Sequence, residues 1–165
     1  MSKTIIFVAV LLMVFSAIAA EVASPTFSIV EPGITPDSPF YFLDEFFENP
    51  GNDPQKALEY KEEKLAELEA MSEKKNANAA KTALQNAQDY GDIIEKEVTP
   101  EMEQKVKQST EIAEMVLEKA QEQLPELQVE IAQKQEQESR ITLAAEISTK
   151  IKQFCETLSN LDPQH

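Results

Sequence analysis

Residues 100–124 read PEMEQKVKQSTEIAEMVLEKAQEQL and contain the cleanest hydrophobic repeat in the chain. Small or apolar side chains recur there in steps of four and three: Met102, Val106, Ser109, Ala113, Val116, Ala120 and Leu124. Such steps place one stripe along a helix, close to the period at which two helices wrap each other. The stretch therefore predicts a helix that packs lengthwise against other helices.

Three further helices are predicted on the N-terminal side of this stretch. A Ser, Asp or Thr directly before a Pro marks a helix start, because the side-chain oxygen accepts an unpaired amide and Pro fits the first helical position. Ser38 with Pro39 and Asp53 with Pro54 mark the starts of two of these helices, and Thr99 with Pro100 marks the start of the helix over 100–124 itself. The helix over 77–98 is predicted from its apolar stripe alone. The predicted helices span 39–48, 54–75, 77–98 and 100–124. The stripe over 54–75 is Ala57, Leu58, Leu65, Leu68 and Met71, and that over 77–98 is Ala80, Leu84, Ala87, Gly91, Ile94 and Val98.

The C-terminal part of the chain is predicted to form one long helix. Pro125 ends or bends the preceding helix, because it lacks an amide and clashes with the turn before it. Over 133–140 no apolar side chain occurs, yet good helix formers continue without Gly, Pro or Asn. Residues 133–140 are either a part of one long helix that protrudes into water or a connection between two helices. We expect the first, a helix over 125–161. The stripe returns at Ile147, Ile151, Phe154, Leu158 and Leu161.

Together these patterns predict an all-α fold. Helices of matching length joined by short turns favour antiparallel hairpins, here a three- or four-helix bundle over 38–124 with a short aromatic helix at its N-terminal end. The last segment either completes the bundle in cis or reaches outward to pair with another copy. Residues 21–37, rich in Pro and without a period, are expected to be an extended arm.

The first twenty residues have the pattern of a secretory signal peptide. Lys3 precedes an uncharged apolar run, and Ala17 and Ala19 frame a small-residue cleavage site. The run is shorter than the roughly 20 residues that span a bilayer, so retention as an anchor is the less favoured alternative. We expect a secreted or extracytoplasmic protein of the cell envelope, without a membrane span after cleavage.

The composition excludes several classes of protein. With 30 acidic and 15 basic residues the net charge is −15, which argues against a nucleic-acid partner. A hydrophobic fraction of 42% argues against wholesale disorder. Because there is a single cysteine, no disulfide can form within the chain, and packing alone must hold the core.

Side chains for catalysis are scarce. The one histidine, His165, stands at the C-terminus, and Gly33, Gly51 and Gly91 are too scattered to cradle a phosphate. Neither a catalytic triad nor a zinc or di-iron site can be assembled from helix residues without histidine. The sequence therefore predicts a protein that is not an enzyme and that has no cofactor and no metal centre.

An aromatic cluster is the most unusual local feature. Tyr41 and four phenylalanines fall within residues 40–47. On a helical projection the apolar half consists of Phe40, Phe42, Leu43, Phe46 and Phe47. Tyr41 lies among the acidic residues of the other half. The apolar half either docks on a partner or a membrane interface, or caps this protein's own bundle as a lid. The lid is favoured, because the polar half has no Lys or Arg to meet anionic lipid.

Two other features leave alternatives open. Cys155, beside Phe154, is either a small buried hydrophobe or the site of an intermolecular disulfide. Glutamates at helical spacing either form a solvated surface or gather divalent cations weakly. They are Glu59, Glu62 and Glu63, then Glu95 and Glu97, then Glu111, Glu114 and Glu118.

The opening of the helical domain resembles a known family. The residues that carry the likeness are the run PDSPFYFL over 36–43, then Lys56, Ala57 and Tyr60, and the run KLAE over 64–67. They resemble a family of exported, mostly archaeal and bacterial proteins known only as a domain of unknown function, over about residues 34–120. Asp44 stands where a basic residue is expected. The resemblance implies an extracytoplasmic helical domain and no established activity.

The functional interpretation is therefore one of contact rather than catalysis. We expect an exported, non-catalytic helical binding or structural module of the cell envelope that binds a protein partner or associates with itself. One alternative is a periplasmic-type chaperone or stress adaptor that holds clients on an exposed apolar face. Another is weak divalent-cation binding by the glutamate-rich helix faces.

Overall fold

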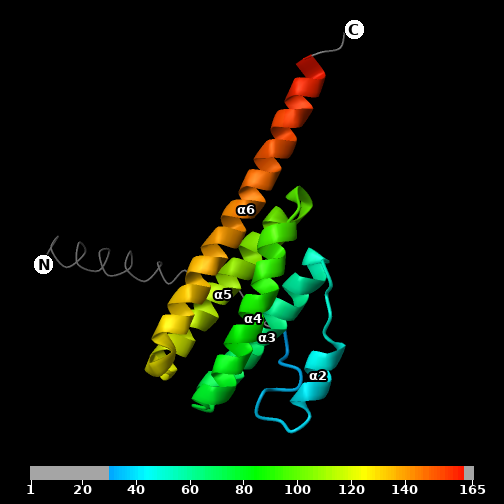
Figure 1. Cartoon of the computed structure of the whole chain (residues 1–165). Coiled ribbons are helices and arrows are strands. Elements are labelled where there is room, and N and C mark those ends of the chain that lie inside the picture. Colours follow the sequence, from blue (N-terminus) through cyan, green and yellow to red (C-terminus); the bar gives the residue numbers. More distant parts are fainter. Residues whose placement is uncertain (1–29, 162–165) are drawn as a thin grey trace, which may run out of the picture.

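The computed structural model of the chain, shown in Figure 1, describes residues 30–161. In that range the chain forms helices and no strand, and four long helices pack as a bundle with one short helix outside it. The all-α prediction is thereby confirmed. The helices are α2 (Tyr41–Phe47), α3 (Pro54–Glu73), α4 (Ala77–Glu97), α5 (Glu103–Gln123) and α6 (Gln128–Leu161), with 3-10 turns η2 (Pro100–Met102) and η3 (Pro125–Leu127).

The predicted signal peptide, residues 1–20, and residues 21–29 of the predicted arm lie outside the described residues. Among the helices that are described, none combines the length and the apolar character needed to cross a membrane.

Local chemistry sets some of the helix ends. At the start of α3, the Asp53 carboxylate accepts hydrogen bonds from the amides of Gln55 and Lys56 at 3.0 and 3.3 Å. The Thr99 side chain makes no such bond, and the chain first forms the turn η2 before α5 begins. Pro125 ends α5 rather than bending it, because the chain reverses through η3 into α6.

The bundle has a square cross-section. Helix α3 packs against α4 and α5, and α6 packs against the same two helices, so α3 and α6 lie at diagonal corners. The predicted stripes of α3 and α5 are buried, as is that of α4 apart from the half-buried Val98.

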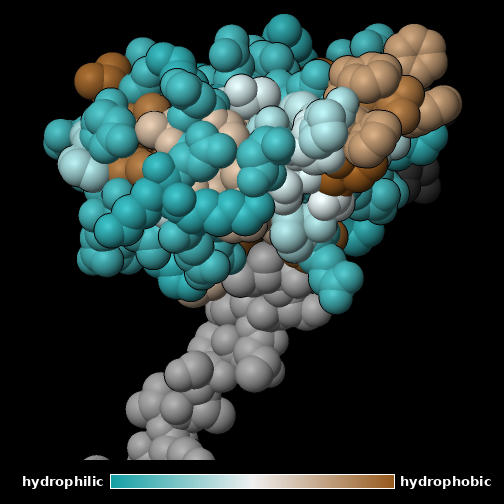
Figure 2. All heavy atoms as spheres, turned by 90° about the horizontal axis from the view of Figure 1, so that it is seen from below, coloured by the Kyte–Doolittle hydropathy of each residue, from teal (hydrophilic) through white to brown (hydrophobic). Residues whose placement is uncertain are grey.

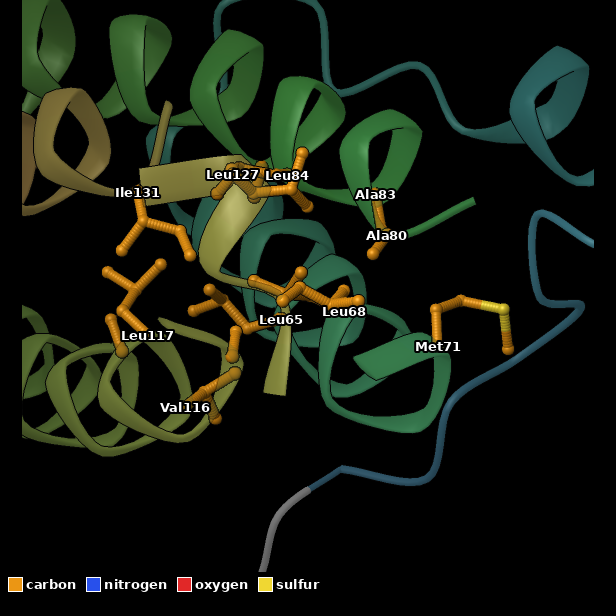
Figure 3. Close-up of a cluster of buried hydrophobic side chains, with 14 of the residues drawn as sticks. Leu65, Leu68, Met71, Ala80, Ala83, Leu84, Val116, Leu117, Leu127 and Ile131 are labelled. Carbon is orange, nitrogen blue, oxygen red and sulfur yellow. The ribbon is translucent and has the colours of Figure 1, made fainter. Parts of the chain in front are cut away.

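The apolar core consists of two separate clusters. One, shown in Figure 3, lies at the α3–α4 turn end of the bundle and includes Leu65, Leu68, Leu84, Leu117 and Ile131. The other lies at the opposite end and contains Ala57, Leu58, Ile94, Met102, Val106, Ile141 and Ala145. Between the two clusters each helix contributes polar side chains or glycine. These buried residues, which we call the polar layer, are Lys61, Gly91, Ser109, Thr110, Lys134, Gln137 and Glu138.

The position of the polar layer corrects one sequence prediction. Residues 133–140 do not protrude into water, because Lys134, Gln137 and Glu138 are buried at the centre of the bundle. The protruding part of α6 is instead its C-terminal end, where residues 151–160 are all exposed. The reason is length: α6 has 34 residues whereas α3 has 20. At about 1.5 Å per residue, α6 extends well beyond its neighbours.

The turn from α3 to α4 contains a strained residue. Lys75 has φ 55°, the left-handed region, and the amide of Asn76 bonds back to the Met71 carbonyl at 2.9 Å. This is the Schellman ending, in which glycine usually occupies the left-handed position because it has no Cβ to clash.

We expect Lys75→Gly to stabilise the protein by about 1 kcal/mol, because it relieves the left-handed strain at an exposed site. Urea unfolding followed by circular dichroism measures the change. Lys75→Ala is the matched control, since it removes the same charge but keeps Cβ and should bring no gain. Equal stability of the two variants would contradict the assignment of strain.

Candidate functional site

The aromatic half of α2 faces solvent. Phe46 and Phe47 are 77% and 75% exposed, and Phe40, Phe42 and Leu43 are exposed as well. The rings of Phe46 and Phe47 meet edge to face with centroids 5.4 Å apart. Figure 2 shows the rings as a tan and brown patch at one corner of a mostly hydrophilic surface. The lid prediction is therefore wrong: α2 does not bury its phenylalanines against the bundle. We call these five residues the aromatic face.

Helix α2 attaches to the bundle through its polar half instead. The Lys64 ammonium of α3, whose side chain is wholly buried, lies 3.3 Å from the Asp44 carboxylate and 2.8 Å from that of Glu48. It also lies 2.8 Å from Glu67 on its own helix. Acidic residues that a helical projection assigns to solvent are thus turned inward, and this orientation forces the phenylalanines outward.

Tyr41 completes the attachment. It is 7% exposed, and its hydroxyl donates to Glu67 Oε2 at 3.0 Å and accepts from Asn86 Nδ2 at 2.8 Å. Lys64 Nζ lies 5.1 Å from the centre of the Tyr41 ring, within range of a cation–π interaction. One aromatic ring of α2 therefore packs inward, and it is the ring that the projection placed among the acids.

The titration behaviour of this cluster follows from its burial. Burial acts to lower the pKa of Lys64, but hydrogen bonds to Glu48 and Glu67 outweigh it and raise that pKa above its usual value. Burial raises the pKa of Glu67 to about 7, against the opposing hydrogen bond and charge of Lys64. The Lys64 ammonium therefore stays charged within the cluster.

The polar layer is a second buried charge network. Glu138 of α6 pairs with Lys61 at 2.7 Å and with Lys134 at 2.9 Å. Lys134 also donates to the Ala87 carbonyl at 2.8 Å and to Gln137 Oε1 at 2.6 Å. Because Lys61 belongs to α3, the Glu138 ion pair joins the two helices that lie diagonally across the bundle.

Charge balance decides how this network titrates. Burial alone would raise the pKa of Glu138, but the charges of Lys61 and Lys134 hold it below its usual value. Burial lowers the pKa of Lys134 to about 8; Glu138 opposes this shift and Lys61 adds to it. Because of burial first and the charge of Lys61 second, Lys134 holds its proton weakly.

Sequence reasoning missed the lysines of both networks, although the pattern contained the information. The α3 stripe has a gap between Leu58 and Leu65, and Lys61 and Lys64 occupy the helical positions that fill it. Lysines at core positions of an amphipathic helix indicate buried partners, because an unpaired buried ammonium is too costly.

One group of carboxylates has the composition of a cation site. Asp44, Glu48 and Glu63 bring oxygens within 4.8 Å of one another. Burial, together with the charges of Glu48 and Asp44, raises the pKa of Glu63, while Lys64 opposes the shift. Lys64 already pairs with Asp44 and Glu48, so the cluster has a resident cation of its own.

The other predicted contact residues lie on α6. Cys155 is exposed, so the interpretation as a buried hydrophobe is wrong, and its thiol is free. Ile147, Ile151, Phe154 and Leu158 are exposed as well, although the sequence stripe suggested packing.

Comparison with known proteins identifies the family. A model described as a domain of unknown function, DUF5667, matches residues 33–127. The chain belongs to this family. No curated protein and no solved structure matches the chain. The DUF5667 region contains α2 to α5 with the whole Lys64 cluster, and it ends where α6 begins, so Lys134 and Glu138 lie beyond it.

We expect Glu138→Gln to destabilise the protein by about 3–5 kcal/mol, because it leaves two buried ammonium groups without a counter-charge. Urea unfolding measures the loss. Glu136→Gln, on the same helix but exposed, is the control and should change stability by less than about 0.5 kcal/mol. The triple change Lys61→Met, Lys134→Met and Glu138→Leu should restore the stability, because it removes every charge together.

Lys134 also predicts a pH dependence. The pKa of Lys134 is about 8 in the folded chain and 10.5 at its usual value. At a pH between these two values the unfolded chain holds a proton that the folded chain has lost, so the free energy of unfolding rises with pH. From pH 7.5 to 10 the free energy of unfolding of the wild type should rise by about 1–3 kcal/mol more than that of Lys134→Met, which lacks the titrating group. Urea unfolding at several pH values measures the difference, with the exposed Lys81→Met as control. Parallel curves for wild type and Lys134→Met would refute the shift.

Proposed function

We propose that this protein is an exported, non-catalytic binding module of the cell envelope and that the aromatic face of α2 is its contact surface. The orientation of α2 carries the proposal. A short helix with so many large apolar side chains at one side would ordinarily bury them against its own bundle. A contiguous apolar patch that stays exposed commonly marks an interaction site. Here Lys64 draws the acidic half inward and leaves the apolar half free.

The chemistry of the surface indicates a protein partner. The acidic residues of α2 are turned toward Lys64 and Asn86, and no basic residue occurs on α2 to meet anionic lipid. Aromatic side chains bury a large area at little cost in conformational entropy, which suits them to anchor a protein contact. Because this chain has a net charge of −15, we expect the partner to have an apolar pocket with a neutral or basic surround.

The envelope location rests on the sequence. Residues 1–20 have the charged, apolar and small-residue parts of a leader, and the family resemblance is to exported archaeal and bacterial proteins. The family itself has no described activity.

A second candidate function is a periplasmic-type chaperone. The observation in its favour is that α6 exposes apolar side chains in addition to the aromatic face. It would be supported if this protein, at or below an equimolar ratio to an unfolded client, kept that client from aggregating.

Weak cation binding is the third candidate, at the cluster of Asp44, Glu48 and Glu63. Heat released or absorbed on titration with millimolar Ca²⁺ would support it.

The decisive experiment replaces two rings of the aromatic face. We expect Phe46→Ser with Phe47→Ser to reduce recovery of the protein with the envelope fraction of its cells by about tenfold or more, because two anchors are lost. The melting temperature should stay within about 1 °C of wild type, since both rings are exposed.

Val129→Ser is the matched control, since Val129 is an exposed apolar residue at the start of α6. It should leave recovery unchanged. Undiminished recovery of the double variant would refute the aromatic face as the contact surface, and a large fall in melting temperature would restore the lid interpretation.

A further inference from the structure

The side of α6 that faces away from the bundle carries a second apolar stripe, which we call the outer stripe. Its members are between 48% and 64% exposed: Leu143, Ile147, Ile151, Phe154 and Leu158. The inward side of the same helix is marked by Ile141 and Ala145, both fully buried. A helix turns by about 100° per residue, so Ile147 points nearly opposite to Ala145. The outer stripe is therefore a separate face rather than a continuation of the core contact.

The spacing of the outer stripe is that of a helix-pairing seam. From Ile147 the apolar residues advance by four, three and four residues to Leu158. These steps correspond to alternating core positions of a heptad repeat, at which side chains of two helices interlock. The seam continues past the end of the bundle, because residues 151–160 are exposed on all sides. A second helix can therefore lie along it without displacing any helix of the bundle.

The charge of the chain indicates what can lie there. Residues 143–161 carry Glu146 and Glu156 against Lys150 and Lys152, so this segment has no net charge, whereas the rest of the chain carries the whole −15. Two copies of so acidic a protein repel each other over most of their surface. The end of α6 is where two copies can meet without that repulsion.

We propose that the outer stripe of α6 pairs with the outer stripe of a second copy of this chain, in an antiparallel two-fold contact. The antiparallel direction places the two acidic bodies at opposite ends of the contact, so their charges lie farther apart than in a parallel pair, and salt screens what repulsion remains. It also makes the stripe self-complementary. Ile147 lies level with the partner's Leu158, and Ile151 with the partner's Phe154, and the two-fold axis repeats both layers.

The position of Cys155 shows that this contact needs no disulfide. Cys155 is next to the seam residue Phe154 and flanks the seam rather than lying in it. In the antiparallel register it is level with Lys150 of the partner subunit and not with the partner's Cys155. Self-association is therefore expected to be the same with and without reductant.

The test is the solution mass of the protein in its exported form, by light scattering on a sizing column over a dilution series. The expected result is twice the mass of one chain at high concentration, with and without reductant. Ile151→Asp with Phe154→Asp should give the mass of one chain. Its circular dichroism should still show a folded helical bundle, and its melting temperature should match that of wild type diluted until it has the mass of one chain, because both side chains are exposed in the single chain.

Gln153→Asp is the matched control, since it adds an acidic residue to the same segment on an exposed side away from the seam. It should remain dimeric, as should Cys155→Ser. A wild type that has the mass of one chain at every concentration overturns the proposal and leaves the outer stripe to another protein. A dimer that Cys155→Ser or reductant dissolves also overturns it.

Disulfide trapping in a Cys155→Ser background tests the register of the two α6 helices separately. Ile147→Cys combined with Leu158→Cys should form an intermolecular disulfide on oxidation, because these positions are level in the antiparallel pair. Ile147→Cys alone should remain uncrosslinked. Crosslinking of the single variant would overturn the antiparallel arrangement, because residues 147 of two chains are level only in a parallel pair.

Discussion

The bundle depends on one carboxylate. Glu138 is buried at the middle of α6 and pairs with a lysine of its own helix and with Lys61 of the diagonally opposite helix. Apolar contacts tolerate small slips along a helix, but a buried ion pair does not, because a slip would leave charges unpaired in a medium of low dielectric constant. The polar layer divides the core into two apolar clusters and aligns the four helices in one register.

Gly91 shows how closely this layer is fitted. The Gln137 carboxamide lies against Gly91, where any Cβ would collide with it, and its amide donates to the Gln88 carbonyl and the Asp92 carboxylate at 2.8 and 2.7 Å. The glycine lets α6 approach α4 at this level. The Lys64 cluster follows the same principle outside the core, since a charge buried in the bundle fixes the orientation of a neighbouring helix.

Much of the fold could be predicted from apolar spacing, and the errors about polar residues share one physical cause. The stripes of α3, α4 and α5 were recognisable because Leu, Ile, Val and Ala recur at helical steps, and Asp53 was recognisable as a cap. Amphipathic reasoning failed wherever polar side chains face inward: at Tyr41 and Asp44 in α2, and over 133–140 in α6. A projection assigns each residue a side by its own polarity. It contains no information on partners such as Lys64 that come from another helix.

The residues of the aromatic face could be recognised in the sequence, but their exposure to solvent could not. Exposure follows from the depth of Lys64, which only the packed bundle defines. The outer stripe of α6 was likewise visible as a repeat, whereas its lack of a neighbour depends on α6 being longer than the helices beside it.

The continuity of α6 has a consequence for binding strength. A pair of chains joined through its protruding end carries two aromatic faces, each held to a rigid body rather than to a flexible linker. Where the envelope presents partner molecules at a matching separation, attachment of the first face raises the effective concentration of the second. Avidity can then exceed the affinity of one face by about 10²–10⁴ without any new contact. A seven-residue helix with weak affinity of its own could in this way hold the protein on a surface.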